Sequence, residues 1–309
     1  MICEMINVYE QIDQNKRRST FIMVFFVVFI VGVVWFLSKA LGYGLGFTGL
    51  ALIVAGLMSF SSYWWGDRII LAISGARQAD KSRDFNFFTV TENLSMAAQI
   101  PMPRLYVIED SAPNAFAAGR DPKHAIVCAT TGLLEKLDRT ELEGVVAHEL
   151  SHIRNFDTRL MGIVTILVGM VILLADWFLR GTLFGRGNRD EEGGQLQAVF
   201  FLVGIMMAIL SPLIAQLIQL AISRRREFLA DASGVMLTRF PDGLARALEK
   251  ISKDREPLEV ANKATAHLFI INPFKGGNHP EHSRRSRFAN LFNTHPPVEE
   301  RIKALREMV

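Results

Sequence analysis

The sequence predicts a mainly α-helical membrane protein with an α+β domain outside the bilayer, about four transmembrane helices and a small antiparallel or mixed sheet. Three observations predict this class. Half of the 309 residues are hydrophobic, and the mean hydropathy is positive at +0.23. Four apolar runs alternate with stretches that have the composition of a soluble domain. One soluble stretch carries histidine and glutamate at helical spacing, which is typical of a metal site on a helix.

The charge and the cysteine content exclude other classes of protein. A net charge of +3 is too small to indicate a nucleic-acid partner, because the basic residues are scattered or flank apolar runs. Cys3 and Cys128 lie far apart and have no CxxC spacing. They therefore predict neither a disulfide framework nor a thiolate metal site, and we expect two buried or neutral thiols.

Residues 19–66 are predicted to form a transmembrane hairpin that follows a cytoplasmic N-terminus at residues 1–18. The runs 21–37 and 44–65 carry no charge, and each approaches the length that crosses a hydrocarbon layer of about 30 Å. A cleaved signal peptide is the competing interpretation of the first run, although no small-residue cleavage site follows it cleanly. Basic residues flank the outer ends of both runs. The positive-inside rule therefore predicts that both ends of the hairpin are cytoplasmic.

Residues 67–159 have a soluble composition and are predicted to form the first part of the α+β domain. Short strands are expected at residues 104–109 and 124–129, where β-branched and aliphatic residues cluster. A third extended segment, residues 113–119, lies between them. Two interpretations of this segment remain open: an edge strand that accepts the backbone of a substrate by strand addition, or an ordinary inner strand.

Two histidines and a glutamate on the next helix form a candidate metal site. The stretch from Asp138 to Glu141 has the form of a capping box and predicts the helix start. His148 and His152 are spaced to share one helix face, so both can point at one ion. Glu149 lies about 100° around the helix and can reach a water beside the ion. The pattern predicts zinc with an open coordination position and hydrolytic chemistry, whereas a surface helix with unrelated histidines is the alternative.

Residues 160–222 are predicted to form a second hairpin that is transmembrane or membrane-associated. Its apolar runs, 160–179 and 196–222, are joined by a link rich in charged residues. These runs are less purely apolar than the first two. A shallow hairpin buried in the bundle, which does not span the bilayer, therefore remains open.

Glu227 is the predicted third metal ligand and begins the second part of the domain, residues 223–309. A catalytic zinc site needs a third protein ligand besides two histidines. Glu227 and Asp231 share a helix face, so Glu227 can bind the ion while Asp231 accepts the free N–H of a ligating histidine. An exposed ion-pair cluster with the preceding arginines is the alternative. Because a hairpin brings its ends together, we expect Glu227 to lie near His148 and His152.

The C-terminal region carries further candidates around a polar loop at residues 275–287. His279 and His282 lie within this loop and are expected to be solvated rather than metal-bound. His295 and Arg301 follow it at the start of a C-terminal helix. They are candidate electrophilic groups, and a local structural pair is an equally open interpretation.

Four motifs together resemble the HtpX family of bacterial membrane-bound zinc endopeptidases and, more distantly, the type I CAAX prenyl proteases. The motifs are His148-Glu-Leu-Ser-His152, Glu227-Phe-Leu-Ala-Asp231-Ala232, Pro113-Asn-Ala-Phe-Ala117 and Thr294-His-Pro-Pro297. They occur in the family's order and spacing, and the resemblance covers nearly the whole chain.

The resemblance implies a zincin-type catalytic domain with one Zn²⁺ and a role for each matching residue. It implies that His148, His152 and Glu227 bind the ion. Glu149 matches the general base, and Asp231 matches the carboxylate that orients a ligand histidine.

The resemblance also implies how a substrate is held. The residues that match the segment pairing with the substrate backbone are Asn114, Ala115, Phe116 and Ala117. His295 and Arg301 match groups that steady the tetrahedral oxyanion.

The function implied by the resemblance is that of a multi-pass endopeptidase of the bacterial inner membrane, with the catalytic domain and both termini cytoplasmic. Its substrates are expected to be polypeptides, among them damaged membrane proteins cleaved in quality control under stress. Two alternatives remain. A processing protease for lipidated or prenylated peptides is one, although the eukaryotic relative has more membrane helices. A non-catalytic membrane adaptor with a structural zinc is the other, although such sites usually have four protein ligands.

Overall fold

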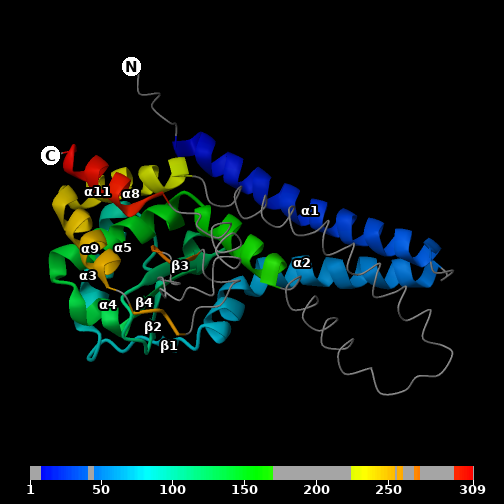
Figure 1. Cartoon of the computed structure of the whole chain (residues 1–309), viewed down its shortest axis with the longest axis horizontal. Coiled ribbons are helices and arrows are strands. Elements are labelled where there is room, and N and C mark those ends of the chain that lie inside the picture. Colours follow the sequence, from blue (N-terminus) through cyan, green and yellow to red (C-terminus); the bar gives the residue numbers. More distant parts are fainter. Residues whose placement is uncertain are drawn as a thin grey trace, which may run out of the picture.

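The computed structural model of the chain describes residues 8–40, 45–169, 224–254, 256–259, 268–271 and 296–308. Two long helices, α1 (Val8–Ala40) and α2 (Leu45–Ile73), run side by side and extend from a more compact body (Figure 1). They cover most of the predicted first hairpin, residues 19–66, but begin earlier and end later, and residues 41–44 between them lie outside the described residues. α2 bends at Trp65, whose backbone angles are not helical.

In the part of the chain that the structure describes, no helix is long and apolar enough to cross a membrane. Most of the predicted second hairpin, residues 170–222, lies outside the described residues, as does the loop at 275–287. The membrane spans therefore stay a prediction. A helical stretch at residues 157–169 packs on the first hairpin, where Leu160 and Val164 share a buried apolar cluster with Ile22.

In the body, the described residues form a four-stranded mixed sheet in the order β1-β2-β4-β3. The strands are β1 (Arg77–Gln78), β2 (Arg104–Ile108), β3 (Ala115–Gly119) and β4 (Ala125–Thr130). β2 and β4 are parallel, and the other two pairs are antiparallel. The small mixed sheet agrees with the predicted class, and among the described residues β3 forms one edge of it. The two-residue strand β1 has no counterpart in the sequence-based prediction.

The two faces of the sheet bury different partners because successive side chains of a strand point to opposite faces. Val107 and Val127 lie in the core shared with α3 (Phe85–Ala98), α5 (Arg139–Arg154) and α9 (Pro241–Lys253). Phe116 and Cys128 point the other way, toward the end of α2. Burial raises the pKa of the Cys128 thiol, so this cysteine is neutral as expected. Cys3 lies outside the described residues.

α5 is the central helix of the body and is buried on almost every side. It contacts α3, α9, the sheet and α8 (Arg224–Thr238). The predicted capping box is present: Glu141 N donates to Asp138 Oδ1 at 2.9 Å, and Asp138 N donates to Glu141 Oε2 at 2.8 Å. Gly144 allows α9 to approach closely, because a Cβ at this position would lie 2.6 Å from the backbone nitrogen of Leu244.

The described residues of the body also form three shorter elements. α4 (Thr131–Lys136) follows β4 directly, a single 3₁₀ turn covers Pro122–His124, and α11 (Val298–Arg306) packs against α8 and α9. Figure 1 shows α11 beside α8, so the end of the chain returns to the region where α5 and α8 meet.

Candidate metal centre

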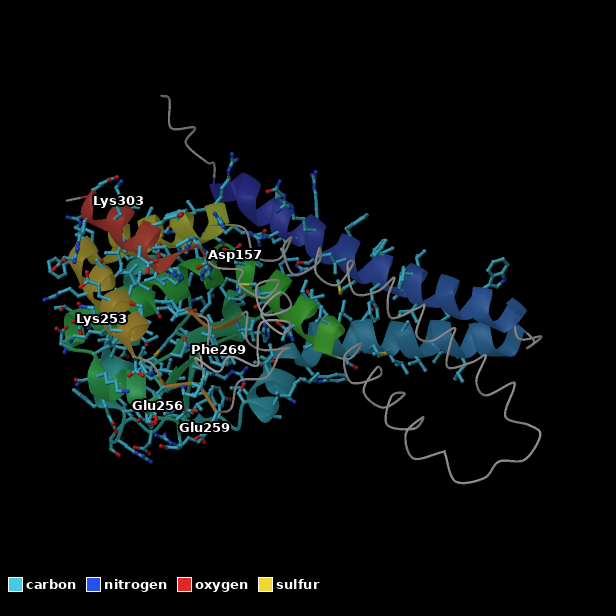
Figure 2. The ribbon with its side chains drawn as sticks, in the orientation of Figure 1. Asp157, Lys253, Glu256, Glu259, Phe269 and Lys303 are labelled. Atoms are coloured by element: carbon cyan, nitrogen blue, oxygen red, sulfur yellow. The ribbon has the colours of Figure 1, made fainter. Side chains whose placement is uncertain are left out.

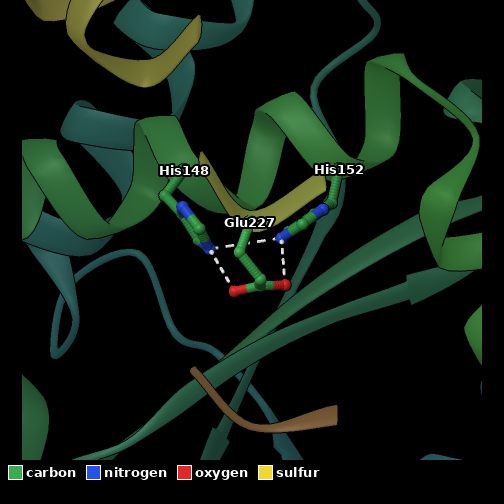
Figure 3. Close-up of side chains that lie close together, drawn as sticks. All are labelled: His148, His152 and Glu227. Carbon is green, nitrogen blue, oxygen red and sulfur yellow. Dashed lines mark hydrogen bonds and ion pairs between the residues drawn. The ribbon is translucent and has the colours of Figure 1, made fainter. Parts of the chain in front are cut away.

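His148, His152 and Glu227 meet as predicted between α5 and α8. One donor atom from each residue lies within 4.8 Å of the others, and all three side chains are buried. The two imidazole Nε2 atoms are 3.2 Å apart. Glu227 Oε2 lies 3.8 Å from His148 Nε2, and Oε1 lies 3.6 Å from His152 Nε2. Figure 3 shows both rings directed from α5 toward the Glu227 carboxylate.

α8 reaches α5 closely because Gly234 lies at their contact. A Cβ on Gly234 would lie 3.1 Å from the backbone nitrogen of His148, closer than most side chains tolerate. The absence of a side chain at Gly234 therefore allows the helix that carries Glu227 to settle against the helix that carries His148.

The residues of this cluster fit zinc. Tetrahedral zinc with bonds of about 2.0–2.2 Å to nitrogen and oxygen places its ligand atoms about 3.3–3.6 Å apart. The separations of 3.2, 3.6 and 3.8 Å between the donor atoms of His148, His152 and Glu227 are close to this spacing. Two imidazoles and one carboxylate also form the donor set of catalytic zinc sites that keep one position open.

The other ring nitrogen of His148 faces a buried carboxylate. Nδ1 lies 2.8 Å from Asp231 Oδ1, and Arg301 donates to both oxygens of Asp231, with Nε–Oδ2 at 2.8 Å and Nη2–Oδ1 at 2.6 Å. A proton on Nδ1 leaves the Nε2 lone pair for an ion. Asp231 therefore lies beside a candidate ligand histidine, as the sequence predicts.

His152 has a corresponding partner that sequence reasoning missed. Its Nδ1 lies 3.0 Å from Asp157 Oδ2, and Asp157 is only 2% exposed. On a continuous helix, a residue five positions later lies about 140° around the axis, so spacing does not point to Asp157. The helix instead ends at Arg154, and Phe156 has a positive φ of 60°. This turn returns Asp157 toward His152.

The two histidines have opposite pKa shifts because their surroundings differ. Burial and the adjacent Arg301 guanidinium outweigh Asp231 and lower the pKa of His148 to about 4. Burial alone would also lower the pKa of His152, but the carboxylates of Asp157 and Glu227 raise it to about 9. Neutral imidazole is the form of histidine that binds a metal ion, and the lowered pKa of His148 favours this form.

Glu149 is positioned beside the cluster but outside it. It is 3% exposed and lines a cavity of about 10 Å³ together with His148, His152, Glu227 and Ala117. A space of about this size matches one water molecule. Glu149 therefore lines the same small volume as the three residues of the cluster, as the sequence pattern predicts.

The predicted substrate segment is the edge strand β3, and another part of the chain already touches this edge. The backbone nitrogen of Ile270 donates to Ala115 O at 3.0 Å, and Asn114 Nδ2 donates to Ile271 O at 3.0 Å. The rings of Phe116 and Phe269 pack edge to face with centroids 5.3 Å apart.

Ala117 lies further along the same edge. Asn114 O accepts from Thr130 on β4, whereas Ala115 O faces the outer edge. In an antiparallel strand, the backbone N–H and C=O groups of successive residues point alternately to one side and to the other. Ala117 is two residues after Ala115, so its backbone groups also face the outer edge. Among the described residues, β3 is therefore an edge strand of the sheet, and its outward-facing backbone groups lie beside the candidate metal centre.

The two predicted electrophilic residues have different outcomes. Arg301 is fully buried and donates to Asp231 and, through Nη1 at 3.3 Å, to Ile270 O. This geometry gives Arg301 contacts that support the site, and the oxyanion role stays a prediction. His295, like His279 and His282, lies outside the described residues.

Comparisons with known proteins decide the family. The model of peptidase family M48 matches residues 82–309. The chain belongs to peptidase family M48. Similar relatives of this M48 protein include a Dictyoglomus thermophilum protein with 43% identity, covering 97% of this chain and 94% of the relative. A Streptococcus uberis protein has 40% identity and covers 97% and 99%, respectively. Both relatives are described as "Protease HtpX homolog".

Among solved structures, the crystal structure of S. mikatae Ste24p is similar to this M48 protein. The match has a TM-score of 0.47 and 15% identity and covers 96% of this chain and 67% of that one. At this TM-score the likeness carries no argument about fold or function. The family assignment therefore rests on the sequence matches, and it makes this protein a member of a metallopeptidase family.

Proposed function

We propose that this protein is a zinc-dependent endopeptidase of the membrane and that His148, His152 and Glu227 hold its single Zn²⁺. The observation that carries the proposal is the closeness of the three donor atoms, within 4.8 Å, beside the Glu149 carboxylate. Membership of peptidase family M48 supports the same conclusion. A structural zinc usually has four protein ligands. Within the described residues, this cluster has three.

Glu149 is the proposed general base and acid. When bound, zinc supplies a Lewis acid that polarises the scissile carbonyl and lowers the pKa of water toward about 7. The Glu149 carboxylate accepts the proton of the attacking water and then donates it to the departing amine. Burial of Glu149 in a small cavity excludes other water from this transfer.

The substrate is proposed to be a polypeptide that adds a strand to the outer edge of β3. The residues proposed to contact it are Asn114, Ala115, Phe116 and Ala117. Ala117 is the central member because its backbone faces the outer edge and the residue lines the cavity beside His148, His152 and Glu227. Strand addition recognises backbone rather than a particular side chain, which suits an enzyme that cleaves damaged proteins of many sequences.

We place the enzyme in the bacterial inner membrane, with the catalytic domain and both termini on the cytoplasmic side. The charge-free runs and their basic flanks support this placement. Its proposed role is quality control of misfolded or damaged membrane proteins during stress. The relatives described as HtpX homologues are proteases by name, which supports the activity.

The proposal is tested with the full-length protein purified in detergent. Zinc stoichiometry is measured by mass spectrometry of the metal, and cleavage is measured with casein. Glu149→Gln is expected to retain about one zinc per chain and to lose cleavage by roughly a thousandfold or more. His148→Ala is expected to lose both zinc and cleavage.

Glu143→Gln is the matched control, because Glu143 lies on the same helix but pairs at the surface with Arg139. It should retain the zinc content and the activity of the wild type. Cleavage that persists in a protease-free Glu149→Gln preparation would disprove the proposed mechanism. Membrane insertion is tested separately by alkaline extraction of membranes, in which the protein should remain in the pellet.

A further inference from the structure

The N-terminal helix α1 contacts the turn that follows the metal-binding helix α5. The Asn15 amide donates to the backbone oxygen of Asn155 at 2.9 Å and to Asp157 Oδ1 at 2.8 Å. The next residue, Lys16, places its ammonium 4.6 Å from the centroid of the Phe156 ring. Two neighbouring residues of α1 therefore contact all three residues of the turn, Asn155, Phe156 and Asp157.

This turn adopts a conformation that needs support. Phe156 has a φ of 60°, which lies in the left-handed region of backbone angles that bulky residues rarely occupy. Such a residue persists where its surroundings hold it in place. Both hydrogen-bond acceptors of Asn15 belong to the turn, and Asn15 itself is 1% exposed. The contact is therefore a buried polar junction rather than a surface encounter.

Asp157 connects this junction to the metal centre. Its Oδ1 accepts from Asn15, whereas Oδ2 faces His152 Nδ1 at 3.0 Å. The guanidinium of Arg226, one residue before Glu227, lies 3.5 Å from the same Oδ1. Figure 2 shows Asp157 at the junction where α1 meets the body.

We propose that Asn15 is a positioning residue of the metal centre and acts through Asp157. Asn15 fixes the Asp157 carboxylate, Asp157 fixes the Nδ1–H of His152, and the Nε2 atom is thereby directed toward the ion. The inference rests on the proposed zinc site. Asn15 precedes residues 82–309, the part that the family model matches. The N-terminal helix is thus a structural part of the metal centre as well as a candidate membrane anchor.

The test compares Asn15→Leu with Gln14→Leu in the full-length protein in detergent. Leucine has nearly the shape of asparagine but cannot donate to Asp157. Gln14 is the matched control, because it is the adjacent amide on α1 and is exposed. Zinc affinity is measured by competition with a chelator, and site geometry by the visible absorption of the cobalt-substituted protein.

Asn15→Leu is expected to weaken zinc binding by roughly tenfold, within the range of 10–100-fold typical of groups that orient metal ligands. It should also alter the cobalt spectrum, whereas Gln14→Leu should match the wild type in both measurements. Asn15→Ser, which is smaller and polar, replaces Asn15→Leu if that variant does not fold.

A double-mutant cycle with Asp157→Asn separates positioning from general packing. If Asn15 acts through Asp157, the combined variant should lose much less affinity than the product of the two single losses. The inference would be overturned if the combined variant lost the full product of the two single losses in zinc affinity. It would also be overturned if Asn15→Leu bound zinc as tightly as the wild type. Wild-type protein that binds no zinc would overturn the proposed function and this inference together.

Discussion

The buried guanidinium of Arg301 forms two hydrogen bonds with the buried carboxylate of Asp231. The two contacts measure 2.8 and 2.6 Å, and neither residue is more than 1% exposed. Burial alone would raise the pKa of Asp231, but Arg301 and His148 keep it below its usual value. The carboxylate therefore stays charged and available to hold His148.

Arg301→Met should strongly destabilise the protein, because it leaves the Asp231 charge buried without its principal partner. Breaking a buried ion pair in this way costs about 3–5 kcal/mol. The control is Arg306→Met on the same helix, where Arg306 pairs with Glu249 at the surface. Loss of such an exposed pair costs about 0–1 kcal/mol. Denaturant unfolding of the metal-free proteins measures both changes in the free energy of unfolding. Equal losses for the two variants would contradict the importance of the buried pair between Arg301 and Asp231.

Gly144→Ala should destabilise the contact between α5 and α9. The added Cβ would lie 2.6 Å from the backbone nitrogen of Leu244, so one helix has to move. Overpacking of this kind costs about 1–3 kcal/mol. Gly162→Ala is the comparison, because its Cβ would lie 4.0 Å from the Ile70 side chain, an ordinary contact.

At Gly162, alanine should be neutral or should stabilise the helix by about 0.4–1 kcal/mol through its lower backbone entropy in the unfolded chain. Thermal or denaturant unfolding distinguishes the two substitutions. A Gly144→Ala variant as stable as the wild type would show that α5 and α9 tolerate a wider separation.

Asp138→Ala should destabilise the helix that carries both histidines by about 1 kcal/mol at neutral pH, the usual effect of a lost N-cap. Asp138→Asn should retain most of this stability, because asparagine also caps. Hydrogen bonds from Thr140 and from the Glu141 backbone lower the pKa of Asp138.

A lowered pKa in the folded protein means that the Asp138 contribution is present above pH 3.8 and is lost as the pH falls through the folded value. The stability difference between wild type and Asp138→Ala should therefore narrow on acidification. Unfolding of metal-free protein between pH 3 and pH 7 measures it. A stability difference between wild type and Asp138→Ala that grows toward low pH would contradict the capping role of the charged Asp138 side chain.

Ile270→Pro should ease access to the β3 edge. Proline has no backbone N–H, so Ala115 O loses the donor that now occupies it. If substrates add a strand at this edge, the KM for a peptide should fall several-fold. Ile270→Ala also shortens the side chain but keeps the donor, so it serves as the control. Equal KM values for the two variants would argue against competition at Ala115.

Local patterns in the sequence predicted much of the candidate site. The capping box and the helical spacing of His148 and His152 depend on neighbours within one helix, and the strands β2 and β4 follow their apolar runs. Glu227 required a topological argument, that a hairpin brings its ends together. The structure places it beside both histidines.

The parts that sequence reasoning missed depend on contacts between distant segments. Asp157 has the wrong helical spacing from His152 and reaches it only through the turn at Phe156. Asn15 is one of several polar residues before an apolar run, and nothing in its surroundings indicates a partner some 140 positions later. The hydrogen bond from the Ile270 backbone nitrogen to Ala115 O likewise joins two distant segments, and no sequence pattern links them.

By itself, the sequence determined the helix that carries the HExxH motif, the three candidate metal ligands that the structure brings together, and membership of peptidase family M48. These properties follow from residue type and from periodicity along the chain. Only the tertiary structure decided which buried groups lie beside the imidazoles of His148 and His152, because hydrogen bonds are directional and short. A carboxylate such as Asp157 acquires its role when a backbone turn brings it to within 3.0 Å of an imidazole, and a residue of another helix holds it there.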